Sequence, residues 1–162
     1  MLSELEQLLA CRRERENRSA AALRQIRLRQ SQAEADVVAA QKALEDHHRE
    51  RRERQDKLYR RSQRSLLTKQ AIDDLNIELD LMAEETDLLV KKVQEAEAVH
   101  VDLTKEVDKA AAIYRQHRQA GDRWGALVTD VTETERRRVE QVEEFTIEDD
   151  LGDRRASGMN GF

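Results

Sequence analysis

The sequence predicts an all-α protein, a long two-helix antiparallel coiled-coil hairpin, and three observations lead to this fold class. A single seven-residue hydrophobic register runs from Leu2 to Val131 without a phase shift, and 24 of its 38 core positions are apolar, against 29 of the other 92 residues. The chain has no proline, and the first of its five glycines is Gly121. The sign of the charge also inverts near the middle of the chain.

The first predicted helix covers about residues 2–64. Its apolar residues recur at the first and fourth positions of each heptad, the spacing that lines one face of a helix. Examples are Leu2, Leu9 and Leu23 at the first position and Leu5, Ile26 and Ala33 at the fourth. Arginines gather near the predicted end of this helix, where a cation interacts favourably with the helix dipole.

A chain reversal is predicted at about residues 65–69, because the charges on its two sides are complementary. Residues 49–64 carry eight Arg or Lys and three acids, and residues 71–87 carry seven acids and no base. Folding back near residue 66 places these segments side by side, which selects the antiparallel arrangement. Thr68 is expected to cap the helix that follows.

The second predicted helix covers about residues 70–145. If residues whose numbers sum to 133 face each other, every first-position residue of one helix meets a fourth-position residue of the other. Large residues then lie against small ones, as in the pair Ala40 and Val93. Residues 1–145 therefore form the predicted hairpin, and residues 146–162 are expected to be a disordered acidic tail.

Fourteen of the 38 core positions are polar, glycine or histidine. In the predicted register Glu16 faces His117. Such positions either fix the register of a deliberately weak seam or allow the rod to bend, and the sequence leaves both interpretations open.

The sequence gives no reason to expect an enzyme, a cofactor or a metal site. It holds no phosphate-binding glycine loop, no nucleophile motif and no His, Cys or acid spacing suited to zinc. Cys11 is the single cysteine, which fits a reducing cytosol. No apolar run is long enough to span a bilayer, the N-terminus does not resemble a signal peptide, and the basic residues lack the aromatic partners of a nucleic-acid site.

Two candidate protein-binding surfaces lie at the two ends of the predicted rod. At the end that holds the termini, a basic patch surrounds a large aromatic residue, a combination favoured in interfaces. It consists of Arg12, Arg13, Arg123 and Trp124. At the tip, where the chain reverses, the candidates are Leu66, Leu67, Ile72 and Asp73. Paired exposed leucines cost solubility unless a partner covers them.

The chain resembles the YscO (SctO) family of type III secretion stalk proteins, which are similar to the flagellar protein FliJ. The resemblance covers roughly residues 1–145 and is carried by the length, the charged hairpin and the tip segment KLYRRSQRSLLTKQAIDDL at residues 57–75. There a Leu-Tyr pair precedes a basic run, a small hydroxyl-containing turn and a new acidic helix.

The resemblance implies a stalk that sits in the central opening of the hexameric secretion ATPase and couples it to the cytoplasmic ring of the export gate. Secretion chaperones are further implied partners. In this picture the end with the termini enters the ATPase, and the tip faces the gate. The protein would be a monomer in the bacterial cytoplasm, peripherally associated with the secretion apparatus at the inner membrane.

The alternative is a structural homodimeric coiled-coil scaffold without an ATPase partner, in which one helix continues straight through residue 66. The unbroken register allows it. In a parallel dimer, however, residues 49–64 would face their own basic copy and residues 71–87 their own acidic copy, which is unfavourable. A third possibility, a curved membrane-binding dimer, requires a one-sided basic surface that the sequence does not contain.

Overall fold

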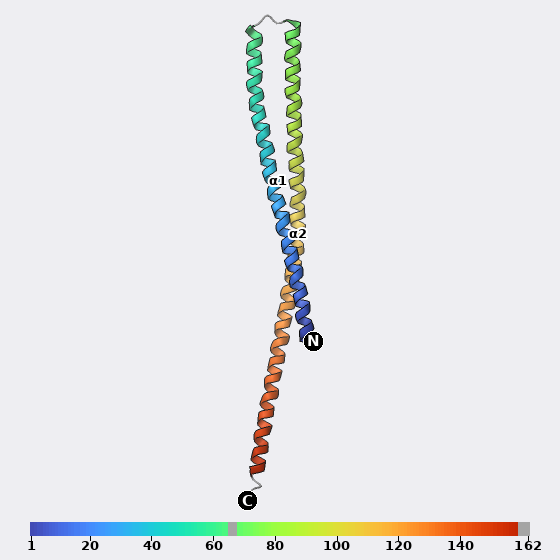
Figure 1. The fold of residues 1–162 in the computed structure, drawn as a ribbon, viewed down its shortest axis with the longest axis vertical. Coiled ribbons are helices and arrows are strands. Elements are labelled where there is room, and N and C mark those ends of the chain that lie inside the picture. Colours follow the sequence, from blue (N-terminus) through green and yellow to red (C-terminus); the bar gives the residue numbers. More distant parts are fainter. Residues whose placement is uncertain (65–67, 159–162) are drawn as a thin grey trace. The chain divides into compact units, whose positions relative to one another are not determined.

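The computed structural model describes residues 1–64 and 68–158, and it contains two helices packed against each other in antiparallel directions (Figure 1). Helix α1 covers Leu2–Arg64 and helix α2 covers Lys69–Gly158. The described residues contain no strand. The predicted all-α hairpin is confirmed.

Helix α2 begins where the sequence indicated that it would. The Thr68 hydroxyl accepts a hydrogen bond from the backbone N–H of Ala71 at 3.2 Å, and the Thr68 carbonyl accepts one from the N–H of Ile72 at 3.2 Å. Because the first N–H groups of a helix have no partner within it, this cap stabilises the first turn.

The end of α2 differs from the prediction. The helix does not stop near residue 145 but continues to Gly158, so the described part of the expected disordered tail is helical. Every residue from Thr132 to Arg155 is exposed. Nine of residues 132–145 are Glu, Arg or Gln, which are good helix formers, and the helix that they favour continues to Gly158 without a proline to end it.

The two helices form two compact units, which are described separately. Unit 1 consists of residues 1–21 and 112–162, and unit 2 consists of residues 22–111. Of the described residues, six are buried, and all six occupy core positions of the heptad register. In unit 1 they are Ser19 and Gly121, and in unit 2 they are Leu23, Ala33, Met82 and Thr86.

Contacts between the helices of unit 2 follow the predicted register. Nε2 of His47 lies 3.0 Å from Oγ1 of Thr86, and these two residue numbers sum to 133. Further along, Nε2 of Gln30 donates to Oγ1 of Thr104 at 3.2 Å. His47 and Thr86 are thus two polar core positions that meet across the helix pair, whereas Gln30 contacts the residue next to Leu103, its predicted counterpart.

Candidate functional site

Within unit 1 the structure brings three of the four predicted residues into defined contacts. The guanidinium of Arg12 lies over the ring of Trp124, 5.9 Å from its centroid, a cation–π arrangement. Trp124 is half-buried. Arg123 is exposed.

Arg13 is held by two carboxylates. Its Nη1 donates to Oε2 of Glu16 at 2.8 Å and to Oδ1 of Asp122, on the other helix, at 3.3 Å. The hydrogen bond to Glu16 raises the pKa of Arg13 above its already high ordinary value, with a smaller contribution from Asp122. Arg13 is therefore cationic at any physiological pH.

Gly121 makes room for this ion pair. A Cβ atom at residue 121 would lie 3.1 Å from Oε2 of Glu16 and 3.2 Å from Nη1 of Arg13. The sequence analysis had placed Glu16 opposite His117. In the structure the carboxylate of Glu16 turns instead to Arg13, and the buried Nδ1 of His117 has no hydrogen-bond partner within the described residues.

The predicted tip surface is only partly described. Leu66 and Leu67 lie outside the described residues. Ile72 and Asp73 lie in the first turns of α2, and both are exposed, with Ile72 at 43%. An exposed isoleucine beside a carboxylate gives this helix start both an apolar and an acidic contact group.

Sequence reasoning missed a polar cluster around Thr86 in unit 2. Thr86 Oγ1 donates to the carbonyl of Met82 at 2.8 Å and accepts a hydrogen bond from Nη1 of Arg51 at 2.9 Å. Since Thr86 has a single hydroxyl proton, His47 must present its Nε2–H to the same oxygen. The register had placed His47 opposite Thr86, which was the available signal.

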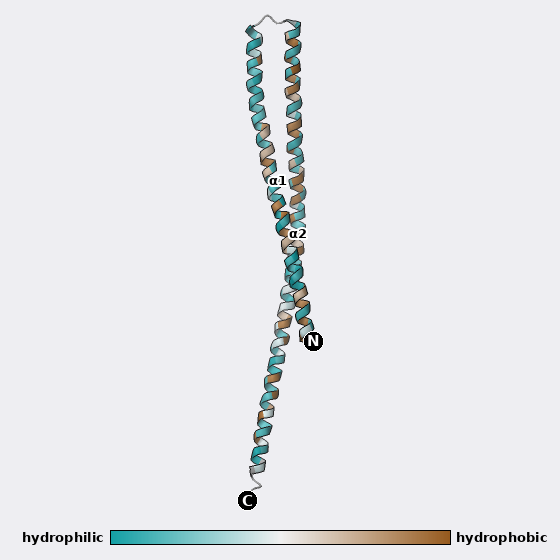
Figure 2. Ribbon diagram, viewed as in Figure 1, coloured by the Kyte–Doolittle hydropathy of each residue, from teal (hydrophilic) through white to brown (hydrophobic). Residues whose placement is uncertain are grey.

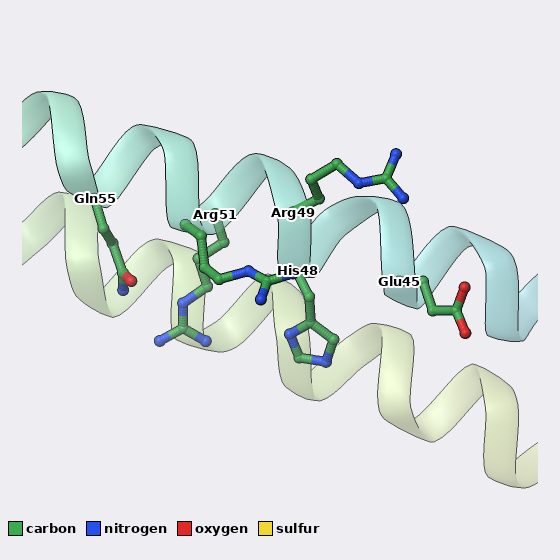
Figure 3. A pocket seen from close by; sticks show the side chains of 6 residues that line it. Glu45, His48, Arg49, Arg51 and Gln55 are labelled. Atoms are coloured by element: carbon green, nitrogen blue, oxygen red, sulfur yellow. The ribbon is translucent and has the colours of Figure 1, made fainter.

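A shallow hollow of about 670 Å³ lies along α1 beside this cluster. Its lining comes from α1 alone and consists of Glu45, His48, Arg49, Arg51, Arg52 and Gln55. Figure 3 shows His48 and Arg51 directed toward α2 and Arg49 directed away from it. The hollow is basic and open, and Arg51 is already engaged by Thr86.

A second hollow, of about 490 Å³, lies between the helices closer to the chain reversal. Leu58, Leu81 and Met82 provide its apolar surface. Basic residues of α1 form one wall and acidic residues of α2 form the other. They are Arg54, Lys57 and Arg61 on α1 and Glu78 and Glu85 on α2. We call this hollow the tip groove.

The described side chains form two surfaces that are suited to binding other proteins. No group of three or more His, Cys, Asp or Glu within residues 1–64 and 68–158 is arranged to hold a metal ion. In the same part of the chain, neither helix has a stretch apolar enough to cross a membrane. The surfaces that remain are the cationic Trp124 region of unit 1 and the tip groove of unit 2.

Comparison with known protein families shows to which family this chain belongs. The sequence profile described as Type III secretion protein YscO matches residues 5–152 of the chain. The chain belongs to the YscO family of type III secretion proteins. The family resemblance drawn from the hairpin pattern and the tip segment is thereby confirmed.

A solved structure shares the fold of this YscO-family chain. The crystal structure of the type III secretion protein YscO from Vibrio parahaemolyticus superposes with a TM-score of 0.77 at 18% sequence identity. The match covers 91% of this chain and 93% of the other. Among curated proteins, none matches the chain.

Proposed function

We propose that this YscO-family chain is the central stalk of a bacterial type III secretion system. It binds the hexameric secretion ATPase through unit 1 and the cytoplasmic ring of the export gate through the tip, and it also contacts secretion chaperones. It acts in the bacterial cytoplasm, peripherally associated with the secretion apparatus at the inner membrane. The proposed role is mechanical and allosteric, and the chain itself catalyses no reaction.

The observation that carries the proposal is the composition of unit 1. Arg12, Arg13 and Trp124 are held in defined positions, and the end of α2 extends past them as a helix whose described side chains are exposed. A preorganised aromatic and cationic cluster is a suitable interface anchor because little side-chain entropy is lost on binding.

A single asymmetric stalk in a six-fold ring would contact unlike faces of identical subunits. It would therefore bias one subunit at a time, and the ring's nucleotide cycle would be coupled to the gate through the stalk. A ligand changes such an equilibrium only through its differential affinity for the alternative states.

The test is ATPase activity and hexamer assembly of the cognate enzyme with the purified chain. We expect the chain to raise activity, and Arg123→Glu to lower the apparent affinity about tenfold or more because it reverses a charge beside Trp124. Arg115→Glu, another exposed arginine of α2 in unit 1, is the matched control. No effect of the wild-type chain on activity or assembly would refute the ATPase assignment.

The tip is tested separately with the isolated cytoplasmic ring of the gate. Ile72→Ser and Asp73→Arg are expected to weaken ring binding, whereas Asp102→Arg, an exposed aspartate farther along α2 in unit 2, is expected to leave it unchanged. Equal loss in Asp73→Arg and Asp102→Arg would mean that general charge, rather than the tip, governs binding.

A further inference from the structure

The tip groove exists because the two helices contribute unequally to the seam near the chain reversal. At its core positions α2 has Leu75, Leu79 and Met82, whereas α1 has Arg54 and Arg61 on either side of Leu58. Figure 2 shows the corresponding contrast, with α1 hydrophilic and α2 more hydrophobic in this region. In the heptad register Leu79 therefore faces Arg54 rather than an apolar residue, so the apolar surface of α2 lacks an apolar counterpart there.

The groove is longer than one hollow. A second hollow of about 230 Å³ shares Leu58, Arg61 and Glu78 with the first and continues to Ala71 and Leu75. On α2 the two hollows together extend over residues 71–85, which corresponds to about 22 Å of helix at 1.5 Å per residue. Leu81, at the wall, is 54% exposed, and Ile77 beside it is 57% exposed.

We infer that the tip groove is a docking site for one amphipathic helix of a partner protein, about 15 residues long. The apolar stripe of that helix packs on the apolar residues of α2 that have no apolar counterpart on α1. One of its flanks is acidic and lies along Arg54 and Lys57, and the other is basic and lies along Glu78 and Glu85. Together, α1, α2 and the partner helix then form a local three-helix bundle.

The opposite signs of the two walls determine this chemistry. A helix with two acidic flanks would be repelled by Glu78 and Glu85, and one with two basic flanks by Arg54 and Lys57. A second copy of the chain fits less well, because it would bring its own Arg54 and Arg61 into the apolar strip and these charges would have to be desolvated.

The inference depends on unit 2 alone and is independent of the proposed ATPase contact, which lies in unit 1. It shares the start of α2 with the proposed gate contact, but its test uses peptides and not the gate ring. Failure of the ATPase experiment would leave it standing, since neither the groove nor its test involves unit 1.

The test uses the full chain and four fluorescent peptides of about 15 residues. The remaining positions of each peptide are filled with good helix formers. One peptide carries a leucine stripe with one acidic and one basic flank, two carry uniform flanks of either sign, and the fourth lacks the leucines. Fluorescence anisotropy gives each Kd, and amide hydrogen exchange locates the binding. We expect the mixed-flank peptide to bind at least about tenfold more tightly than the other three, with protection over residues 54–62 and 71–85.

Two pairs of variants distinguish peptide binding in the tip groove from nonspecific binding elsewhere on the chain. Leu81→Gln removes an exposed apolar wall residue and should weaken the mixed-flank peptide about tenfold, whereas Leu88→Gln, at a leucine of α2 outside the groove with 59% exposure, should not. Lys57→Glu should weaken it as well, and Lys42→Glu, an exposed lysine of α1 outside the groove, is its control.

Two outcomes would overturn the inference. One is a loss of selectivity: the mixed-flank peptide binds no better than the leucine-free peptide, or it binds the Leu81→Gln variant as tightly as the wild-type chain. The other is a dimer of the chain alone by sedimentation that Leu81→Gln dissociates, because a second copy would then be the occupant.

Discussion

At the residue scale, Gly121 is a position where backbone preference and side-chain space oppose each other. A glycine within a helix is less favourable than alanine by about 1 kcal/mol. A Cβ atom at residue 121, however, would press on the far ends of Glu16 and Arg13. These ends are flexible, so a shift of a few tenths of an ångström accommodates the methyl group.

We therefore expect Gly121→Ala to stabilise the chain by less than about 1 kcal/mol, and Gly125→Ala to give the larger gain. At residue 125 the nearest atom to an added Cβ is Nη2 of Arg13 at 3.5 Å, an ordinary contact. Urea unfolding followed by circular dichroism gives both values. A Gly121→Ala chain less stable than the wild type would mean that the Arg13–Glu16 pair cannot move.

Thr86 gives a second prediction at this scale. Thr86→Val keeps the shape but removes the oxygen that Nε2 of His47 and Nη1 of Arg51 contact. Because His47 is only 14% exposed, loss of its partner should cost about 1–3 kcal/mol of unfolding free energy.

The double variant His47→Leu with Thr86→Val tests the cause of that loss. Replacing both partners by apolar groups removes the unsatisfied donor and should recover most of the stability in the same urea experiment. If the double variant is as unstable as Thr86→Val, the hydrogen bond is not the source of the loss.

At the element scale, the last part of α2 is a helix without a packing partner. Val139, Val142 and Phe145 are all more than half exposed. Isolated helices are marginally stable in water, because most helical stability in proteins comes from burying an apolar face. This part of α2 therefore contributes little to the stability of the chain on its own.

We expect a chain that ends after Val131 to unfold at the same urea concentration as the full chain, with a change in unfolding free energy below about 0.5 kcal/mol. Amide hydrogen exchange in the full chain should be faster over residues 139–150 than over residues 93–107. A large loss of stability on truncation would instead show that this segment packs on the rest of the chain in solution.

The helices could be predicted from the sequence because the heptad register determines which residues face inward. The six residues that are buried in the described part of the chain all fall on it, including the polar Ser19 and Thr86. The extension of α2 to Gly158 was missed because the register ends at Val131, and beyond that point only local helix preference acts. Neither the pairing of Glu16 with Arg13 nor the tip groove follows from periodicity, since both depend on where long side chains turn.

At the scale of the whole molecule, the antiparallel pairing distinguishes the hairpin from a dimer of long straight helices. Ala40 and Val93 face each other in the register that His47 and Thr86 follow. A chain carrying Ala40→Cys, Val93→Cys and Cys11→Ser should therefore form a disulfide within one chain on mild oxidation.

Non-reducing electrophoresis and mass spectrometry check this prediction. We expect a monomeric product in which a disulfide joins the peptides around residues 40 and 93. A product of twice the mass would support the homodimeric scaffold instead, and the single variant Ala40→Cys with Cys11→Ser controls for random collision.

The polar layers of the seam also affect how the helix pair responds to force. Apolar contacts are non-directional, so an apolar seam resists sliding only through the interlocking of its side chains. A hydrogen bond such as that between Gln30 and Thr104, or either of the two contacts that His47 and Arg51 of α1 make to Thr86, is lost when its donor moves by a fraction of a helical turn. These layers therefore oppose axial shear between α1 and α2, so that a push on one helix is passed to the other.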